Sequence, residues 1–310
     1  MTKKIAVPVD GSRNSMKSLD YLDFIYHNKH NIDINLFHIL PSLPWIITDE
    51  EAENEQIWTQ IKYVEKKKVI LAEQILSEAK IALVEKGFKE EKVRTSYHKM
   101  EVTIHKDICH WARSREADAI LLGRRGRTDV KTFFLGEICD KLVECCDGSS
   151  LWIVGGRVDS KKVLVCIDAS KNALRAVKHV GVMLSGTDCH VTIFHTMGHL
   201  RRFLPIAILE EAEDLIRLWG EKSEQQIDTY IEEAREILLN AGLAEEQVAV
   251  KMIDGTKSPA NDILREALAN NYGTVVLGRR GDSMMKELFL GSVSKKVLLH
   301  LSDLAVWIVH

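Results

Sequence analysis

Two glycine-rich segments of the chain have the residue types and spacing of an anion-binding loop. They read Gly123-Arg124-Arg125-Gly126, then nine residues, then Gly136-Glu137, and Gly278-Arg279-Arg280-Gly281, then nine residues, then Gly291-Ser292-Val293-Ser294. Glycines allow main-chain N–H groups to approach a ligand closely. The segment after Gly291 opens an apolar-periodic helix, whose first amides lack intrahelical partners and attract phosphate. The alternative is that Ser292 and Ser294 only cap the helix.

An aspartate follows the first apolar run of each half of the chain. Asp10 comes after Val7-Pro8-Val9, and Asp168 comes after Val165-Cys166-Ile167. In a doubly wound sheet, ligands bind at the carboxyl ends of the strands, where the strand order reverses. A carboxylate placed there can accept hydrogen bonds from ribose hydroxyls, whereas the alternative role is to cap the next helix. Together with the glycine segments, the pattern favours the ribose role.

The two segments differ at the residue that a phosphate would contact most closely. Glu137 stands in the first segment where Ser292 stands in the second. A carboxylate beside a triphosphate is repulsive, but it suits the positive end of its own helix. We therefore predict an intact nucleotide site in the second half and a degenerate one in the first, where Glu137 takes the place of the phosphate. A divalent cation such as Mg²⁺ would relieve the repulsion.

The paired arginines of each segment could clamp phosphate oxygens, or they could lie in a solvated turn. We retain Arg280 as a candidate contact. Histidines and cysteines such as His105 and Cys109 match no standard zinc spacing. No Ser-His-Asp or paired-carboxylate pattern is visible either, so we expect at most slow hydrolysis of a bound nucleotide.

The glycine segments belong to a longer repeat. Gly123 and Gly278 are 155 residues apart, and so are Trp152 and Trp307. A period of this length is the size of a domain. We predict two domains, 1–156 and 157–310, which are joined by the short linker 155–160 and pack together.

Each half alternates β-rich runs with helical patterns. The predicted strands are 4–9, 33–40, 92–98, 119–123 and 151–154 in the first half, and 162–167, 190–196, 247–253, 274–277 and 305–309 in the second. The predicted helices are 14–28, 55–86, 104–115 and 136–145, then 170–184, 209–240, 259–269 and 291–301. Runs such as Ile120-Leu121-Leu122 are apolar throughout, which indicates strands covered by helices on both faces. The pattern predicts two doubly wound, five-stranded parallel α/β domains of Rossmann-like type. The apolar last strands would be aggregation-prone edges, so we expect them to pair with each other.

The composition is that of an ordinary globular protein. Of 310 residues, 45% are hydrophobic and 28% are charged, and the formal net charge is −3. This balance argues against broad electrostatic binding to nucleic acid or to a membrane surface. The chain shows no signal region and no apolar run long enough to span a bilayer. The six irregularly placed cysteines suit a reducing compartment, so we predict a cytoplasmic protein.

Taken together, these motifs resemble the universal stress protein family in its tandem form, over essentially the whole chain. The resemblance implies ATP as the ligand, which Mg²⁺ could accompany. It further implies phosphate contacts from Gly281, Gly291, Ser292 and Val293, ribose contacts from Asp168 and Gly278, and an adenine contact from the backbone of Thr196. Arg280 and Ser294 complete the predicted site. The corresponding residues of the degenerate site are Asp10, Ile39, Gly123, Gly126, Gly136 and Glu137.

We therefore expect an ATP-binding stress-response protein that acts through conformation or through an unidentified protein partner. The alternatives are a nucleotide-free scaffold and a slow ATP hydrolase. Family members commonly dimerise through the last strand, which implies an intramolecular pseudo-dimer here and leaves a homodimer open.

Overall fold

The computed structural model describes residues 2–26, 31–43, 55–124, 135–146, 148–197, 213–256, 258–279, 290–301 and 303–310. The chain divides into two compact units, residues 1–149 and 150–310, hereafter the N-terminal and the C-terminal unit. Each is described by itself. The division falls seven residues before the boundary that the repeat predicts, because the last strand of the first repeat pairs within the C-terminal unit.

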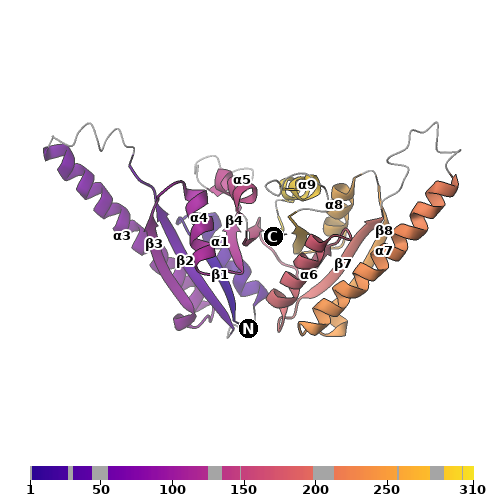
Figure 1. The fold of residues 1–310 in the computed structure, drawn as a ribbon. Coiled ribbons are helices and arrows are strands. Elements are labelled where there is room, and N and C mark those ends of the chain that lie inside the picture. The colour runs from indigo at the N-terminus through magenta and orange to yellow at the C-terminus, as the bar shows by residue number, and fades with distance from the viewer. Residues whose placement is uncertain are drawn as a thin grey trace. The chain divides into compact units, whose positions relative to one another are not determined.

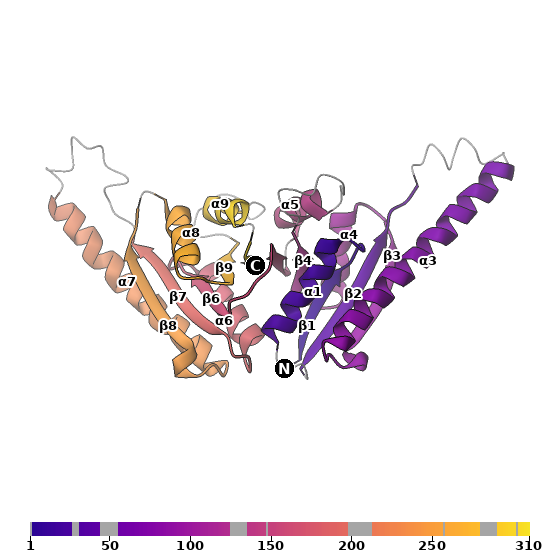
Figure 2. The ribbon, with the colours of Figure 1, turned by 180° about the vertical axis from the view of Figure 1, so that it is seen from behind.

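The N-terminal unit contains four parallel strands in the order β3-β2-β1-β4. Helices α1 and α3 pack against one face of this sheet, and α4 and α5 pack together on the other (Figures 1 and 2). The strands are β1 (Lys3–Pro8), β2 (Ile32–Leu40), β3 (Val93–Lys99) and β4 (Ala119–Gly123). The helices are α1 (Arg13–Ile25), α3 (Glu55–Glu85), α4 (Ile104–Ser114) and α5 (Leu135–Cys145), with a short 3₁₀ turn at Glu90–Lys92.

The C-terminal unit contains six strands in the order β5-β10-β9-β6-β7-β8, with β5 antiparallel to the rest. The strands are β5 (Ser150–Val154), β6 (Lys162–Cys166), β7 (His190–Met197), β8 (Val248–Asp254), β9 (Thr274–Gly278) and β10 (Ala305–Val309). The helices are α6 (Lys171–Leu184), α7 (Glu213–Asn240), α8 (Pro259–Ala269) and α9 (Ser292–His300), with a 3₁₀ turn at Glu245–Gln247. Helix α6 packs on α7, and α8 packs on α9.

The sequence pattern explains these layers. Every residue of β4, β5 and β10 is buried, as expected for strands that helices cover on both faces. The fold is the predicted one, with five strands from each repeat wound in the doubly wound order. The expected pairing of the last strands is also confirmed, because β5 and β10 pair antiparallel with Trp152 opposite Trp307.

An aromatic cluster stabilises this pairing. The rings of Trp152 and Trp307 stack with centroids 3.8 Å apart and an angle of 2° between their planes. His179 of α6 lies edge-on to both rings, and its Nε2 accepts a hydrogen bond of 3.0 Å from Trp152 Nε1. Aromatic pairs of this kind contribute about 1 kcal/mol beyond their buried area. Burial lowers the pKa of His179 to about 4, so the ring is neutral at pH 7.

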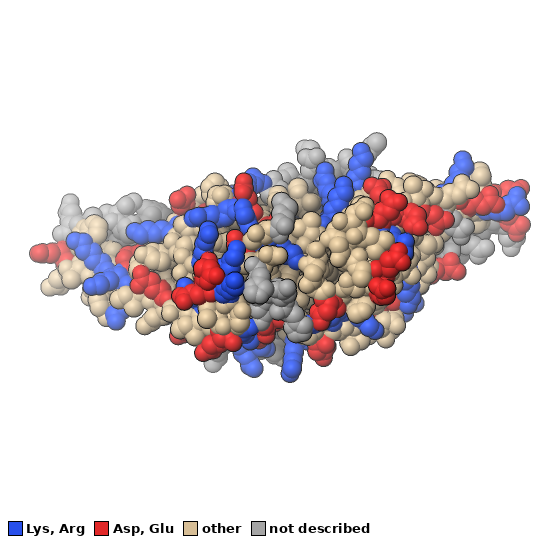
Figure 3. Space-filling model, turned by 90° about the horizontal axis from the view of Figure 1, so that it is seen from below, with Lys and Arg blue, Asp and Glu red and all other residues tan. Residues whose placement is uncertain are grey.

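The helices and the surface of the chain bear on binding to membranes and to polyanions. Among the helices of the described residues, none combines the length and the apolar character needed to cross a bilayer. On the face shown in Figure 3, basic and acidic side chains are interspersed. A mixed surface of this kind offers no single-sign patch for steering a polyanion.

The first prediction concerns the acid stability of the C-terminal unit. Because the pKa of His179 is lower in the folded chain than in the unfolded one, the unfolded state binds the extra proton as the pH falls from about 6.5 to 4. The free energy of unfolding should therefore be undiminished above pH 6.5. It should decrease as the pH falls through this window, by about 2 kcal/mol at pH 5. Urea unfolding followed by tryptophan fluorescence at pH 7 and pH 5 measures the change. His179→Gln should show a smaller loss than the parent chain and than the His190→Gln control; equal losses would contradict this assignment.

Candidate functional site

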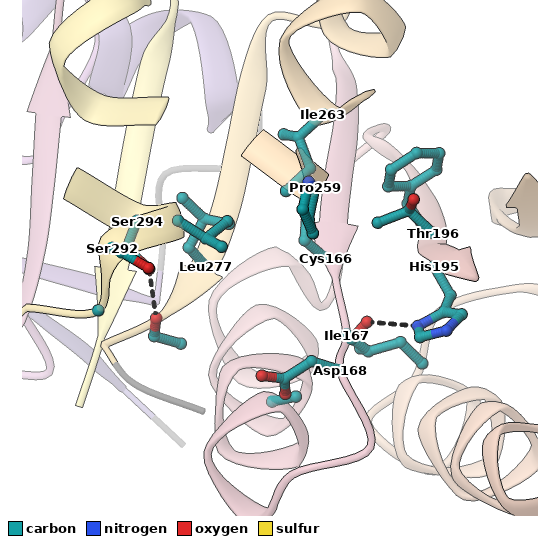
Figure 4. Close-up of a pocket in the computed structure, with 15 residues that line it drawn as sticks. Cys166, Ile167, Asp168, His195, Thr196, Pro259, Ile263, Leu277, Ser292 and Ser294 are labelled. Atoms are coloured by element: carbon teal, nitrogen blue, oxygen red, sulfur yellow. Dashed lines mark hydrogen bonds between the residues drawn. The ribbon is translucent and has the colours of Figure 1, made fainter. Parts of the chain in front are cut away.

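A cavity of about 390 Å³ opens at the carboxyl ends of β6, β7 and β9 in the C-terminal unit (Figure 4). It lies where β9 and β7 flank β6 on opposite sides, which is the position where α/β sheets bind ligands. Its lining contains seven of the nine residues predicted for the nucleotide site: Asp168, Thr196, Gly278, Gly291, Ser292, Val293 and Ser294. The other two, Arg280 and Gly281, lie outside the described residues.

The first turn of α9 forms one wall of the cavity. Its N-cap residue, Gly291, has no side chain with which to cap the helix. By contrast, Ser12, Ser170 and Ser258 cap α1, α6 and α8 by accepting hydrogen bonds from the amides three residues onward. The amides at the start of α9 are therefore left to water or to a ligand.

Two hydrogen bonds fix this turn against the end of β9. The Gly291 N–H donates to the Arg279 carbonyl at 3.0 Å. The Ser294 hydroxyl donates to the Gly278 carbonyl at 2.9 Å, as the dashed line at the left of Figure 4 shows. The amide of Gly291 is thus already bonded, and the amides of Ser292, Val293 and Ser294 remain for an anion.

Asp168, two residues after the end of β6, also lines the cavity. Its side chain is exposed, and no hydrogen bond or ion pair is recorded for it within the described part of the chain. The equivalent Asp10 differs, because its Oδ1 accepts a hydrogen bond of 3.0 Å from the Ser12 amide. The carboxylate of Asp168 is therefore better placed to accept hydrogen bonds from a ligand. Ala169, the next residue, has a φ of +57°, which is unusual for a residue with a Cβ.

Histidines that the sequence analysis did not assign to the sites tie the strand ends together. His195 Nδ1 donates to the Ile167 carbonyl at 2.8 Å, and His38 Nδ1 donates to the Val9 carbonyl at 2.7 Å (His195 in Figure 4). Burial lowers the pKa of His195, and the bond to Ile167 only partly offsets this effect. The ring is therefore neutral at pH 7, with Nε2 as an acceptor. The signal was present in the sequence, because a Phe-His pair lies near the end of the second strand in both halves, at Phe37-His38 and Phe194-His195.

Helix α8 completes the cavity with Pro259 and Ile263. It also supplies Asp262, which is 1% exposed and accepts hydrogen bonds from the Thr196 and Thr256 hydroxyls at 3.0 and 2.7 Å. The Thr196 hydroxyl is thus engaged, which leaves its backbone for the predicted adenine contact. Sequence reasoning missed this network, since 66 residues separate its two ends.

The N-terminal unit has a second cavity, of about 360 Å³, at the corresponding strand ends. Asp10 and Ile39 line it, whereas Gly123 does not. Gly126 lies outside the described residues, and Gly136 and Glu137 lie in the first turn of α5, where only the backbone is described. The structure thus brings together part of the degenerate site.

The remaining candidates lie away from the cavities. Arg279 is 7% exposed, and its amide donates to the Val309 carbonyl at 2.7 Å. A hydrogen bond with the Cys146 thiol, followed by burial, raises the pKa of Cys109, so this thiol stays protonated and is a poor nucleophile. In the described part of the chain, no group of three or more His, Cys, Asp or Glu side chains is arranged to hold a metal ion.

Comparison with known proteins identifies the family. The model of the Universal stress protein family matches residues 1–151 and again residues 160–310. Universal stress protein YxiE of Bacillus subtilis is 31% identical over 147 residues, which are 44% of this chain and 90% of that protein.

Two solved structures share the fold over nearly the whole chain. One is a universal stress protein from Archaeoglobus fulgidus, with 20% identity, a TM-score of 0.61, and coverage of 99% of this chain and 97% of that one. The other is a protein of unknown function from Pseudomonas aeruginosa, with 13% identity, a TM-score of 0.55, and coverage of 99% and 92%.

The second prediction concerns the glycines that end β4 and β9. A Cβ at Gly123 would lie 1.9 Å from the Asn14 carbonyl oxygen, whereas a Cβ at Gly278 would lie 3.1 Å from that of Asn172. Close packing against the first turn of α1 or α6 is thus a reason for glycine that does not involve a ligand. Gly123→Ala should destabilise its unit by about 3 kcal/mol or more, and Gly278→Ala by about 1 kcal/mol. Urea denaturation measures the loss in free energy of unfolding for both variants. Equal losses in the two variants would contradict the prediction.

With both family matches placed on the two repeats that the structure shows, the chain belongs to the universal stress protein family as a tandem member.

Proposed function

We propose that the chain binds ATP in the cavity of the C-terminal unit and acts as a nucleotide-dependent regulatory protein of the stress response. The observation that carries the proposal is the helix start at Gly291, which leaves the amides of Ser292, Val293 and Ser294 without a side-chain cap on the wall of a ligand-sized cavity. Uncapped amides at the positive end of a helix bind phosphate. The resemblance of the motifs to the family implies that the phosphate belongs to ATP.

The other side of the cavity supports a nucleoside. The Asp168 carboxylate can accept hydrogen bonds from ribose hydroxyls, which are donors. The hydroxyl proton of Thr196 is donated to Asp262, so the backbone N–H of Thr196 is the donor that this residue can offer to a base. Ile167, Phe194, Ile263 and Leu277 supply apolar surface for an adenine ring. An anion site at one end and an apolar slot at the other match the two ends of ATP.

The N-terminal unit lacks the same combination. Asp10 already accepts the Ser12 amide, and the sequence places Glu137 where the C-terminal unit has Ser292. We propose that the nucleotide is held mainly in the C-terminal unit and that Mg²⁺, where it accompanies ATP, is coordinated by the phosphates.

The third prediction tests the phosphate end of the site. Ser292→Glu should weaken ATP binding at least about tenfold, or by about 1.4 kcal/mol, because it places a carboxylate beside the phosphates. Ser292 is exposed, so the substitution should leave the fold intact. Isothermal titration of the purified, nucleotide-free chain measures the affinity, and Ser292→Gln, which has the same size without the charge, is the matched control. Unchanged affinity in Ser292→Glu would remove this site and favour a nucleotide-free scaffold.

The fourth prediction concerns the ribose end and the number of sites. Asp168→Asn should weaken ATP binding roughly tenfold through the loss of a charged acceptor, whereas Asp10→Asn should leave it unchanged. The same titrations should give a stoichiometry nearer one ATP per chain than two. Two equal sites, or equal effects of the two substitutions, would contradict a site confined to the C-terminal unit.

A further inference from the structure

The cavity of the N-terminal unit differs in chemistry from its counterpart, although it occupies the same place at the strand ends. Most of its lining is apolar, and Asp10 is the one Asp, Glu, Lys or Arg among the described residues that line it. Ile39 stands where the C-terminal unit has Thr196, and Ile104 stands where it has Pro259. An aliphatic residue thus replaces Thr196, and the sequence has Glu137 at the position of Ser292.

The second layer behind the cavity shows the same change. Phe37 lines the cavity, and the ring of Trp111 stacks behind it with centroids 4.0 Å apart and 15° between their planes. In the C-terminal unit the residue 155 positions later is Glu266, whose carboxylate pairs with Lys251 at 2.8 Å. An aromatic pair thus backs the N-terminal cavity at the place where an ion pair lies in the C-terminal unit. Of this pair, Phe37 lines the cavity, and its ring offers aromatic surface that favours planar, apolar ligands.

The shape of the cavity also suits a ligand. Ile104 and Ile108 lie one turn apart on α4 and both face the cavity, and Ile138 faces it from α5. A concave apolar site of about 360 Å³ falls within the range of small-molecule pockets, 300–1,000 Å³. Asp10 places a carboxylate among the described lining residues, so the cavity tolerates a positive charge.

We propose that the N-terminal cavity binds a predominantly apolar, planar small molecule that is uncharged or cationic, and that it does not bind a nucleoside triphosphate. The chain would then hold two different ligands in its two repeats. This inference does not rest on ATP binding by the C-terminal unit, because it follows from the lining of the other cavity.

Nile red, a neutral, planar and apolar dye that brightens in apolar sites, is the probe. Titration of the full chain should reveal one saturable site. Ile108→Asp should weaken dye binding about tenfold or more, whereas Ile263→Asp, at the equivalent place in the other cavity, should retain it. Binding that survives Ile108→Asp, or that is lost equally in Ile263→Asp, would overturn the proposal.

Ile108 is buried, so Ile108→Asp could lose dye binding by unfolding the unit. A second pair of variants therefore tests the cavity at a less buried position. Ile104 is half-buried at the cavity wall. Ile104→Trp should fill the cavity and weaken dye binding about tenfold, whereas Ile104→Val should retain it, with both variants checked by circular dichroism. Retention of dye binding in a folded Ile104→Trp chain would overturn the proposal.

Competition separates this site from the nucleotide site. Saturating ATP or adenosine should leave bound Nile red in place, and ATP affinity should be the same in Ile104→Trp as in the parent chain. Displacement of the dye by either compound would show that the N-terminal cavity is a nucleoside site and would overturn the proposal. A parent chain that binds Nile red but does not bind ATP would refute only the function proposed above.

Discussion

The candidate nucleotide site depends on which backbone amides in the first turn of α9 are hydrogen-bonded within the chain and which are left open. Gly291 begins the helix without a capping side chain, and its own amide is bonded to the Arg279 carbonyl. The Ser294 hydroxyl holds the same turn to the end of β9. A serine or an aspartate at position 291 would cap the turn internally, as Ser170 caps α6. The turn is therefore fixed in place while its amides stay open, which is the preorganisation that anion binding requires.

The two repeats keep the same backbone arrangement and differ in the side chains at the strand ends. The histidine that bonds to a carbonyl is present in both, as is the aspartate after the first strand. The residues around them diverge. The C-terminal cavity combines hydroxyls, open amides and an available carboxylate, whereas the N-terminal cavity is lined mainly by aliphatic and aromatic groups. The two repeats thus share a scaffold, and the proposal of different ligands rests on their side chains, since specificity lies in the site and not in the fold.

Much of this arrangement could be predicted from the sequence. The apolar runs that became β4 and β9 predicted buried parallel strands, and the tryptophan-centred last strands predicted the pairing of β5 with β10. Helix starts were predictable to within a few residues where serines cap them, as at Ser170 and Ser258. Seven of the residues predicted for one site line a single cavity, because the carboxyl ends of parallel strands meet at one edge of the sheet. Their predicted ligand contacts stay a prediction.

Other features could not be read from the sequence, because they join residues far apart in the chain. The close approach of the Asn14 carbonyl to Gly123 gives that glycine a packing role that its motif does not reveal. The bond from Thr196 to the buried Asp262 depends on how α8 packs beside β7. The bond between Gly291 and the Arg279 carbonyl likewise depends on where α9 begins in space. Local patterns predicted the elements, and tertiary packing determined which polar groups remained for a ligand.

The most direct test of the central claim is a crystal structure of the full chain grown with a non-hydrolysable ATP analogue. The account predicts electron density for the nucleotide in the C-terminal cavity, with phosphate oxygens at the amides of Ser292 and Val293 and ribose hydroxyls at Asp168. A nucleotide found instead in the cavity lined by Asp10 and Ile39, or a C-terminal cavity that stays empty at saturating analogue, would contradict it.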